Sequence, residues 1–358
     1  VAQLKIDILS GKYNSGKPFP SVRAIARRHA CSSATAQRTL DELFHMGLIS
    51  RKQGRGTFVT KEGASRKIGL IVPGIAYSEF YLPFLSEINR LATENGYSLL
   101  LGEVYSNDPK ARVDQVRLLA NQFVNEGVAG VVYQPFELLS EAGLINQRVL
   151  SEFDSRRIPV VLVASDIVPS PTRSSYDIVG INDLEAGRRL ALHLKEQGVR
   201  RVVFLLNEYS NFSVQNRLIG LRSVFADSGV VKESHFDPLD TKVVRRLVFG
   251  RDAPDAIVCR SDALAARLLT TLRVLGKNVP EDLLVAGFND IGYAASLDLT
   301  SIKVPSADIA RFAFQALRAR MNDPKLIPNE CMLPAPLTVR GSTTRLKKVK
   351  AGQRGHRL

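Results

Sequence analysis

The sequence has no tryptophan, only three cysteines and only three methionines among 358 residues. So few cysteines, without the spacing of metal ligands, exclude a disulfide framework and are typical of a protein of the reducing cytoplasm. We expect Cys31, Cys259 and Cys331 to be small buried apolar groups. No stretch of about 18 apolar residues is free of charges, which argues against a membrane span.

The common motifs of enzymes are also absent. The sequence contains no Gly-Lys-Ser/Thr phosphate loop, no His-Glu-x-x-His pair and no Gly-x-Ser-x-Gly turn around a nucleophile. Its five histidines are scattered along the chain. The sequence therefore predicts a protein without enzymatic activity, and it indicates no metal and no cofactor.

The positive charge of the chain is unevenly distributed. Residues 1–67 carry a net charge of +9 and the tail after Ser342 carries +6, which leaves −1 for residues 68–342 out of a total of +14. A basic head on a nearly neutral body is typical of a polyanion-binding module joined to a domain with another role. Charge alone leaves open a basic terminus that is merely solvated.

The first 60 residues follow the order of a winged helix-turn-helix. The start, 1–9, repeats apolar residues at helical spacing and is interrupted by charges, so it predicts a helix and not a secretory signal. Ser21 is the expected N-cap of a second helix from Val22 to about His29, and a third begins at Ser33. The apolar stripe of this third helix, which should face the core, consists of Ala36, Leu40, Leu43 and Phe44.

The other face of the third helix is polar near its N-terminus, where a recognition helix meets base edges. After it, Ile49–Lys52 and Gly56–Thr60 alternate as two short strands around a glycine hairpin. This hairpin would carry Arg55 at the tip of a wing. The joint order of turn, helix, turn, helix and wing predicts a DNA-binding module.

This module resembles the GntR superfamily of bacterial transcription regulators over roughly residues 3–60, through Pro20-Ser-Val-Arg23 and Gly54-Arg-Gly-Thr-Phe58 among other motifs. Ser33 and Gln37 stand where the family usually has arginines. Because glutamine pairs with adenine and arginine with guanine, we expect a different operator from the family's common half-site. The predicted DNA-binding residues are Ser21, Arg23, Ser33, Thr35, Gln37, Arg38, Arg55 and Gly56.

After a short polar linker at 61–67, the pattern changes to α/β. Continuous apolar runs such as Ile68–Val72 and Val202–Leu206 alternate with helical stretches. Strands that are buried on both faces and alternate with helices predict parallel sheets flanked by helices. Ligands of such sheets lie beyond the carboxyl ends of the strands.

Residues 68–343 resemble the LacI-type effector domain, which has the type I periplasmic-binding-protein fold. The matching segments include Ile68–Val72, Val179–Gly187, Arg217–Leu221, Ala286–Asp290 and Val339–Ser342. The resemblance implies two lobes, approximately 68–181 with 304–324 and 182–303 with 325–343, and we expect 344–358 to be a disordered basic tail. A GntR-type head on this body is the layout of the arabinose-repressor type of regulator.

The resemblance also implies a small polar ligand between the lobes. Arg217 best matches the family's ligand-gripping residue, because its planar fork can hold two hydroxyls or a carboxylate; an ion pair within its lobe is the alternative. Family carboxylates are replaced at several positions, so we expect an effector less hydroxyl-rich than a pentose, or partly anionic. Aromatic rings could stack on a sugar or belong to the core. The predicted effector-binding residues are Tyr77, Phe80, Gln134, Asn182, Arg217, Ser261 and Asn289.

The sequence thus predicts a cytoplasmic, homodimeric transcription regulator, a repressor more than an activator. It would bind a double-stranded DNA operator and respond to a sugar-like effector, and the dimer would pair the exposed helices near Tyr81–Arg90 and Arg267–Leu275. One alternative is an exported sugar-binding protein, against which the basic head argues. Another is a regulator controlled by a protein partner, with a vestigial ligand cleft.

Overall fold

The computed structural model describes most of the chain. Residues 61–65 of the predicted linker, Tyr77 and the basic tail from 346 onward lie outside the described residues. No helix in the described part is long and apolar enough to cross a membrane. The described residues are 2–9, 12–13, 17–52, 54–60, 66–73, 80–104, 108–136, 142–206, 210, 212–225 and 231–345.

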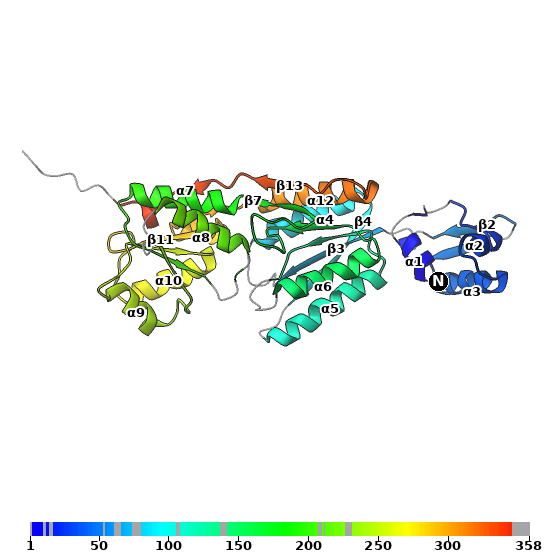
Figure 1. The fold of residues 1–358 in the computed structure, drawn as a ribbon, viewed down its shortest axis with the longest axis horizontal. Coiled ribbons are helices and arrows are strands. Elements are labelled where there is room, and N and C mark those ends of the chain that lie inside the picture. The colour runs from blue at the N-terminus through cyan, green and yellow to red at the C-terminus, as the bar shows by residue number, and fades with distance from the viewer. Residues whose placement is uncertain are drawn as a thin grey trace, which may run out of the picture. The chain divides into compact units, whose positions relative to one another are not determined.

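The N-terminal 60 residues form a winged helix-turn-helix with a core of its own, as predicted (Figure 1). Ser21 and Ser32 cap the second and third helices, because their hydroxyls accept hydrogen bonds from the amides of Ala24 and Thr35 at 3.3 and 3.1 Å. The elements are α1 (Ala2–Leu9), α2 (Val22–Arg28), α3 (Ser33–His45) and an antiparallel hairpin of β1 (Ile49–Lys52) and β2 (Gly56–Val59).

The inward face of α3 differs from the prediction at one residue. Ala36, Leu40 and Leu43 are buried, but Phe44 is 44% exposed, so its predicted place in the core is wrong. The residue after Leu43 lies about 100° further around a helix, and Thr39 takes the inward position on the other flank. The ring of Phe44 lies beneath the guanidinium of Arg51, 5.3 Å away.

The whole chain divides into two compact units. Unit 1 consists of Val1–Ile181, Asn211–Ser213 and Pro305–Pro334, whereas unit 2 consists of Asn182–Ser210, Val214–Val304 and the chain from Ala335 onward. The chain therefore crosses from unit 1 into unit 2 for the last time after Pro334, later than the boundary predicted at residue 324. The reason is a strand pair, since β13 (Glu330–Leu333) adds to the unit 1 sheet.

The body of unit 1 is a six-stranded parallel sheet in the order β13-β7-β6-β5-β3-β4. Helices α4 and α12 pack together on one face, and α5 and α6 pack side by side on the other (Figure 1). Strands β5 and β6 are buried at every residue, as their apolar runs predict. The elements are β3 (Arg66–Pro73), α4 (Tyr81–Glu94), β4 (Tyr97–Val104), α5 (Pro109–Asn125), β5 (Gly130–Tyr133), α6 (Ala142–Ser155), β6 (Val160–Val163), β7 (Asp177–Ile181) and α12 (Ser306–Asn322).

Unit 2 has a six-stranded sheet in the order β14-β12-β11-β10-β8-β9, parallel except for β14. Cys259 is buried in it, whereas Cys31 and Cys331 of unit 1 are only partly buried, contrary to expectation. The elements are α7 (Asp183–Glu196), β8 (Val202–Leu205), α8 (Phe212–Val224), β9 (Val231–Ser234), α9 (Thr241–Phe249), β10 (Ala256–Cys259), α10 (Asp262–Val274), β11 (Leu284–Asn289), α11 (Gly292–Ser296), β12 (Thr300–Lys303), β14 (Leu337–Thr338) and a 3-10 turn (Gly341–Thr343).

Helices α7 and α8 of unit 2 touch backbone to backbone at two glycines. A Cβ atom on Gly187 would lie 2.1 Å from the carbonyl oxygen of Arg217. A Cβ atom on Gly220 would lie 2.0 Å from the carbonyl oxygen of Leu184. This close approach needs glycine at both positions. It fixes α8, and with it Arg217, against α7.

We therefore expect Gly220→Ala to lower the free energy of unfolding by about 1–3 kcal/mol, the usual cost of forcing extra volume into a packed contact. The matched control is Gly143→Ala in α6, where an added Cβ would meet nothing within 4 Å; alanine there should leave stability unchanged or raise it by up to ~1 kcal/mol. Urea unfolding measures both variants. Equal stability of the two would contradict the close contact.

A buried carboxylate holds the turn that follows β11. Asp262 is 0% exposed. Its Oδ1 accepts a hydrogen bond from the hydroxyl of Ser301 at 2.6 Å, and its Oδ2 accepts one from the amide of Ile291 at 3.0 Å. Burial raises the pKa of Asp262 to about 6, although these hydrogen bonds oppose the rise. The charged form at neutral pH is therefore unfavourable in the native state.

Asp262→Asn should remove that cost, because the asparagine oxygen can accept from the amide of Ile291 while its NH2 group donates to the hydroxyl of Ser301. A raised native pKa stabilises the fold below about pH 4, and this contribution is lost as pH rises through about 6. The stability of the variant relative to wild type should thus be greatest above pH 6 and decline toward pH 4. Urea unfolding of both proteins at several pH values measures this difference. A difference that does not vary with pH would refute the shifted pKa.

Candidate functional site

The predicted DNA-binding residues all lie on the surface of the head. Ser21 and Arg23 are exposed at the start of α2, and the four predicted positions of α3 are exposed in its first two turns. Arg55 and Gly56 are exposed at the hairpin. Gly54 and Gly56 have φ values of +70° and +103°, which glycine adopts without strain, so the hairpin turns tightly and presents Arg55.

Two of the predicted residues on α3 are already bonded within the head. The hydroxyl of Thr35 bonds that of Ser32 at 2.8 Å. The Nε2 of Gln37 donates to the carboxylate of Asp41 at 3.0 Å. The sequence predictions do not include Asp41, although its spacing of four residues from Gln37 indicates such a contact on a helix.

In unit 2, Arg217 is 9% exposed and lies at the carboxyl ends of the strands. Its Nε donates to Asp183 Oδ1 at 2.7 Å, and its Nη1 donates to the carbonyl of Arg260, just after β10, at 3.0 Å. The guanidinium also lies 4.5 Å from the ring centre of Phe288 in β11. The ion pair within the unit, the alternative left open by the sequence, is thus present. Burial raises the pKa of Asp183, against the effect of Arg217.

The other predicted effector-binding residues of unit 2 have structural roles as well. Asn182 and Ser261 are the N-caps of α7 and α10, and their side chains accept hydrogen bonds from backbone amides at 3.0 and 3.4 Å. Asn289 ends β11 with a φ of +108°. Strands β10 and β11 are neighbours, so Ser261 and Asn289 lie at the same edge as Arg217.

In unit 1, two predicted residues lie at the corresponding edge, after the neighbouring strands β3 and β5. Gln134 directly follows β5 and is 7% exposed. Its Oε1 is buried without a hydrogen-bond partner among the residues that the structure describes. Phe80 is half-buried before α4, stacked 6.5 Å from the ring of Phe84 and therefore partly a core residue. Tyr77 lies outside the described residues.

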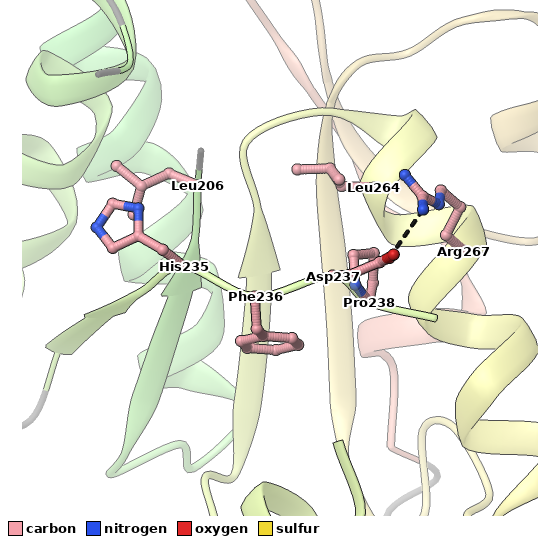
Figure 2. A pocket seen from close by; sticks show the side chains of 7 residues that line it. All are labelled: Leu206, His235, Phe236, Asp237, Pro238, Leu264 and Arg267. Carbon is pink, nitrogen blue, oxygen red and sulfur yellow. Dashed lines mark hydrogen bonds and ion pairs between the residues drawn. The ribbon is translucent and has the colours of Figure 1, made fainter. Parts of the chain in front are cut away.

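A hollow of about 300 Å³ lies at another part of the unit 2 sheet, near the end of β9 (Figure 2). Figure 2 shows the ion pair within it, in which Arg267 Nη2 donates to Asp237 Oδ1 at 2.8 Å. None of the predicted effector-binding residues lines this hollow. Its lining residues are Leu206, His235, Phe236, Asp237, Pro238, Leu264 and Arg267.

Two family models match the chain in separate regions. Residues 1–59 match the bacterial regulatory proteins of the gntR family. Residues 191–343 match the periplasmic binding protein-like domain. These matches cover the winged head and most of unit 2, in agreement with the two resemblances seen in the sequence.

Two curated relatives match the chain over most of their length. The chain is 26% identical to the arabinose metabolism transcriptional repressor of Geobacillus stearothermophilus, over 88% of this chain and 89% of the relative. It is also 26% identical to the transcriptional repressor CytR of Escherichia coli strain K12, over 90% and 92% of the two chains.

A solved structure confirms the fold of the body. The LacI family regulator of Enterococcus faecalis, which was solved with bound ribose, superposes with a TM-score of 0.66 at 23% identity, over 79% of this chain and 100% of that one. The chain therefore joins a region that matches the gntR family, residues 1–59, to a region that matches the periplasmic binding protein-like domain, residues 191–343.

Proposed function

We propose that the chain is a transcriptional repressor that binds an operator through its winged head and changes its operator affinity when a small polar, sugar-like effector binds. The observation that carries the proposal is the exposed polar face of α3 together with the exposed Arg55 of the wing, in an N-terminal segment, residues 1–67, whose net charge is +9. Phosphate attraction supplies affinity on such a surface, and the side chains on α3 supply sequence preference.

Gln134 supports a ligand with hydroxyl groups. A buried acceptor without a partner costs about 1–3 kcal/mol, and a donor from a ligand would offset that cost. Arg217 supports the same class of ligand. A guanidinium has five N–H donors, of which Asp183 and the carbonyl of Arg260 use two. Because Asp183 already neutralises Arg217, a neutral polar effector fits better than a carboxylate.

We further infer a cytoplasmic homodimer, since two heads are needed to occupy two half-sites. The two helices predicted to form the dimer each expose a large apolar side chain. Leu82 of α4 is 62% exposed and Val274 of α10 is 72% exposed. Control by the effector follows if the effector binds one arrangement of the dimer more tightly than another.

We expect the purified protein to bind a palindromic duplex, with an affinity that falls about a thousandfold or more between about 50 and 200 mM salt if six or more phosphates are contacted. Fluorescence anisotropy across a salt series measures the slope. Arg55→Ala should make the slope shallower, whereas Arg246→Ala, an exposed arginine of α9, should not. Salt-independent binding would contradict the proposal.

The effector site is best tested at Gln134. Arg217→Ala would leave Asp183 buried and unpaired, at a cost of about 3–5 kcal/mol. A loss of effector response in that variant could therefore come from unfolding as well as from a lost ligand contact. Gln134→Met removes the acceptor that has no partner among the described residues, and it roughly keeps the volume of the side chain. A sugar that stabilises the wild type by about 2.7 kcal/mol at a hundred times its Kd should lose at least about tenfold in affinity for this variant.

Thermal shift with a panel of pentoses and hexoses identifies the sugar, and anisotropy then measures operator release or recruitment. Gln147→Met, at an exposed position of α6, is the matched control and should respond as the wild type does. If Gln134→Met binds the operator and responds at the wild-type sugar concentration, Gln134 is not an effector ligand.

A further inference from the structure

Three side chains form a continuous contact from the recognition helix to the wing. Gln37 and Asp41 lie one turn apart on α3, and the Nε2 of Gln37 donates to Asp41 Oδ1 at 3.0 Å. The same oxygen accepts a hydrogen bond from Nη2 of Arg51 in β1 at 2.5 Å, and the two charged side chains form an ion pair. Arg51 is held in turn over the ring of Phe44.

Asp41 puts a carboxylate on the surface that we propose binds DNA. The side chains of Asp41 and Arg51 are both 42% exposed, so Asp41 lies near the surface that would face the DNA phosphates. The hydrogen bond from Arg51 holds the pKa of Asp41 below its ordinary value, so the group is ionised at neutral pH. A negative charge on a DNA-binding face weakens binding, and Arg51 only neutralises it.

The chemistry of the contact fixes the orientation of the glutamine. An ionised carboxylate only accepts hydrogen bonds, so the amide of Gln37 must turn its Nε2 and not its Oε1 toward Asp41. One Nε2 hydrogen is used in this bond. The second hydrogen and the Oε1 remain, and these are the donor and acceptor that match N7 and the N6 amino group of adenine.

We propose that Asp41 is a specificity-determining positioning residue, which holds the amide of Gln37 in the orientation that pairs with adenine in the major groove. The inference rests on the proposed function, because it requires α3 to enter that groove. It adds that the base preference of this head is a property of the Gln37–Asp41 pair and not of Gln37 alone. The competing explanation is that Asp41 and Arg51 merely fasten the helix to the wing.

The test is selection from a random duplex library with the wild type and five variants of this chain, followed by anisotropy on the enriched sequence and its single-base changes. The wild type should prefer adenine at one position in each half-site. Gln37→Ala and Asp41→Ala should both lose about tenfold of that preference, at the same position. The double variant should lose no more than Gln37→Ala alone, because the two residues act as one unit.

Two further variants separate orientation from charge. Asp41→Asn removes the charge, but Arg51 would still donate to the Oδ1 of asparagine and keep that oxygen toward Nε2 of Gln37. The variant should therefore retain the adenine preference and bind DNA more tightly. Glu42→Ala removes an equal charge at the next position of α3, where the side chain is exposed. It should also bind more tightly, without a change in base preference. Thermal unfolding confirms that each variant is folded.

If Asp41→Ala enriches the same DNA sequence as the wild type, with the same preference for adenine, this inference is overturned and the DNA-binding function stands. The same loss of preference in Asp41→Ala and Asp41→Asn would also overturn it, because charge and not orientation would then be responsible. A wild type that enriches no sequence would overturn the proposed function itself, and this inference with it.

Discussion

The buried ion pair between Arg217 and Asp183 is the contact on which the carboxyl edge of the unit 2 sheet depends. It joins α8 to α7, and the same guanidinium reaches the end of β10 and the ring of Phe288 in β11. One side chain thus connects two helices to two neighbouring strands. The backbone contact at Gly187 brings the helices close enough for the bond to form. A buried ion pair of this kind is weak evidence for a more stable fold, but it fixes the positions of the groups that it joins.

A fixed arginine has consequences for the ligand. Because its position is already set by protein contacts, a hydroxyl that reaches it need not order a long side chain, which lowers the cost of binding. Gln134 in unit 1 contrasts with it, since Arg217 is engaged whereas the Oε1 of Gln134 has no partner among the described residues.

Local signals in the sequence predicted local structure well. The cap at Ser21, the wing strands and the apolar runs of β5, β6 and β8 follow from periodicity and from residue type. The polar edge strand β9 alternates only partly and was not predicted. The place of β13 depends on pairing with a strand about 150 residues earlier in the chain, which no local pattern encodes.

The candidate sites were predictable as positions but not as contacts. The sequence placed Ser261 and Asn289 at strand ends and Arg217 on a helix, where the structure also has them. It did not give the partners of Arg217 or the role of Asp41, since both arise from side chains that meet across separate elements. Asn182 and Ser261 illustrate a further ambiguity, because residue types that bind hydroxyls also cap helices.

The pairing of β13 with β7 and of β14 with β12 also bears on how the protein is made. Each sheet of the body receives its last strand from the final 30 or so residues of the described chain, and neither sheet is complete until these residues have been synthesised. The head is built from one contiguous segment at the other end. During synthesis, which proceeds from the N-terminus, the head would therefore fold before the body. A truncated chain would keep the module that attaches to DNA but would lack the part that regulates it.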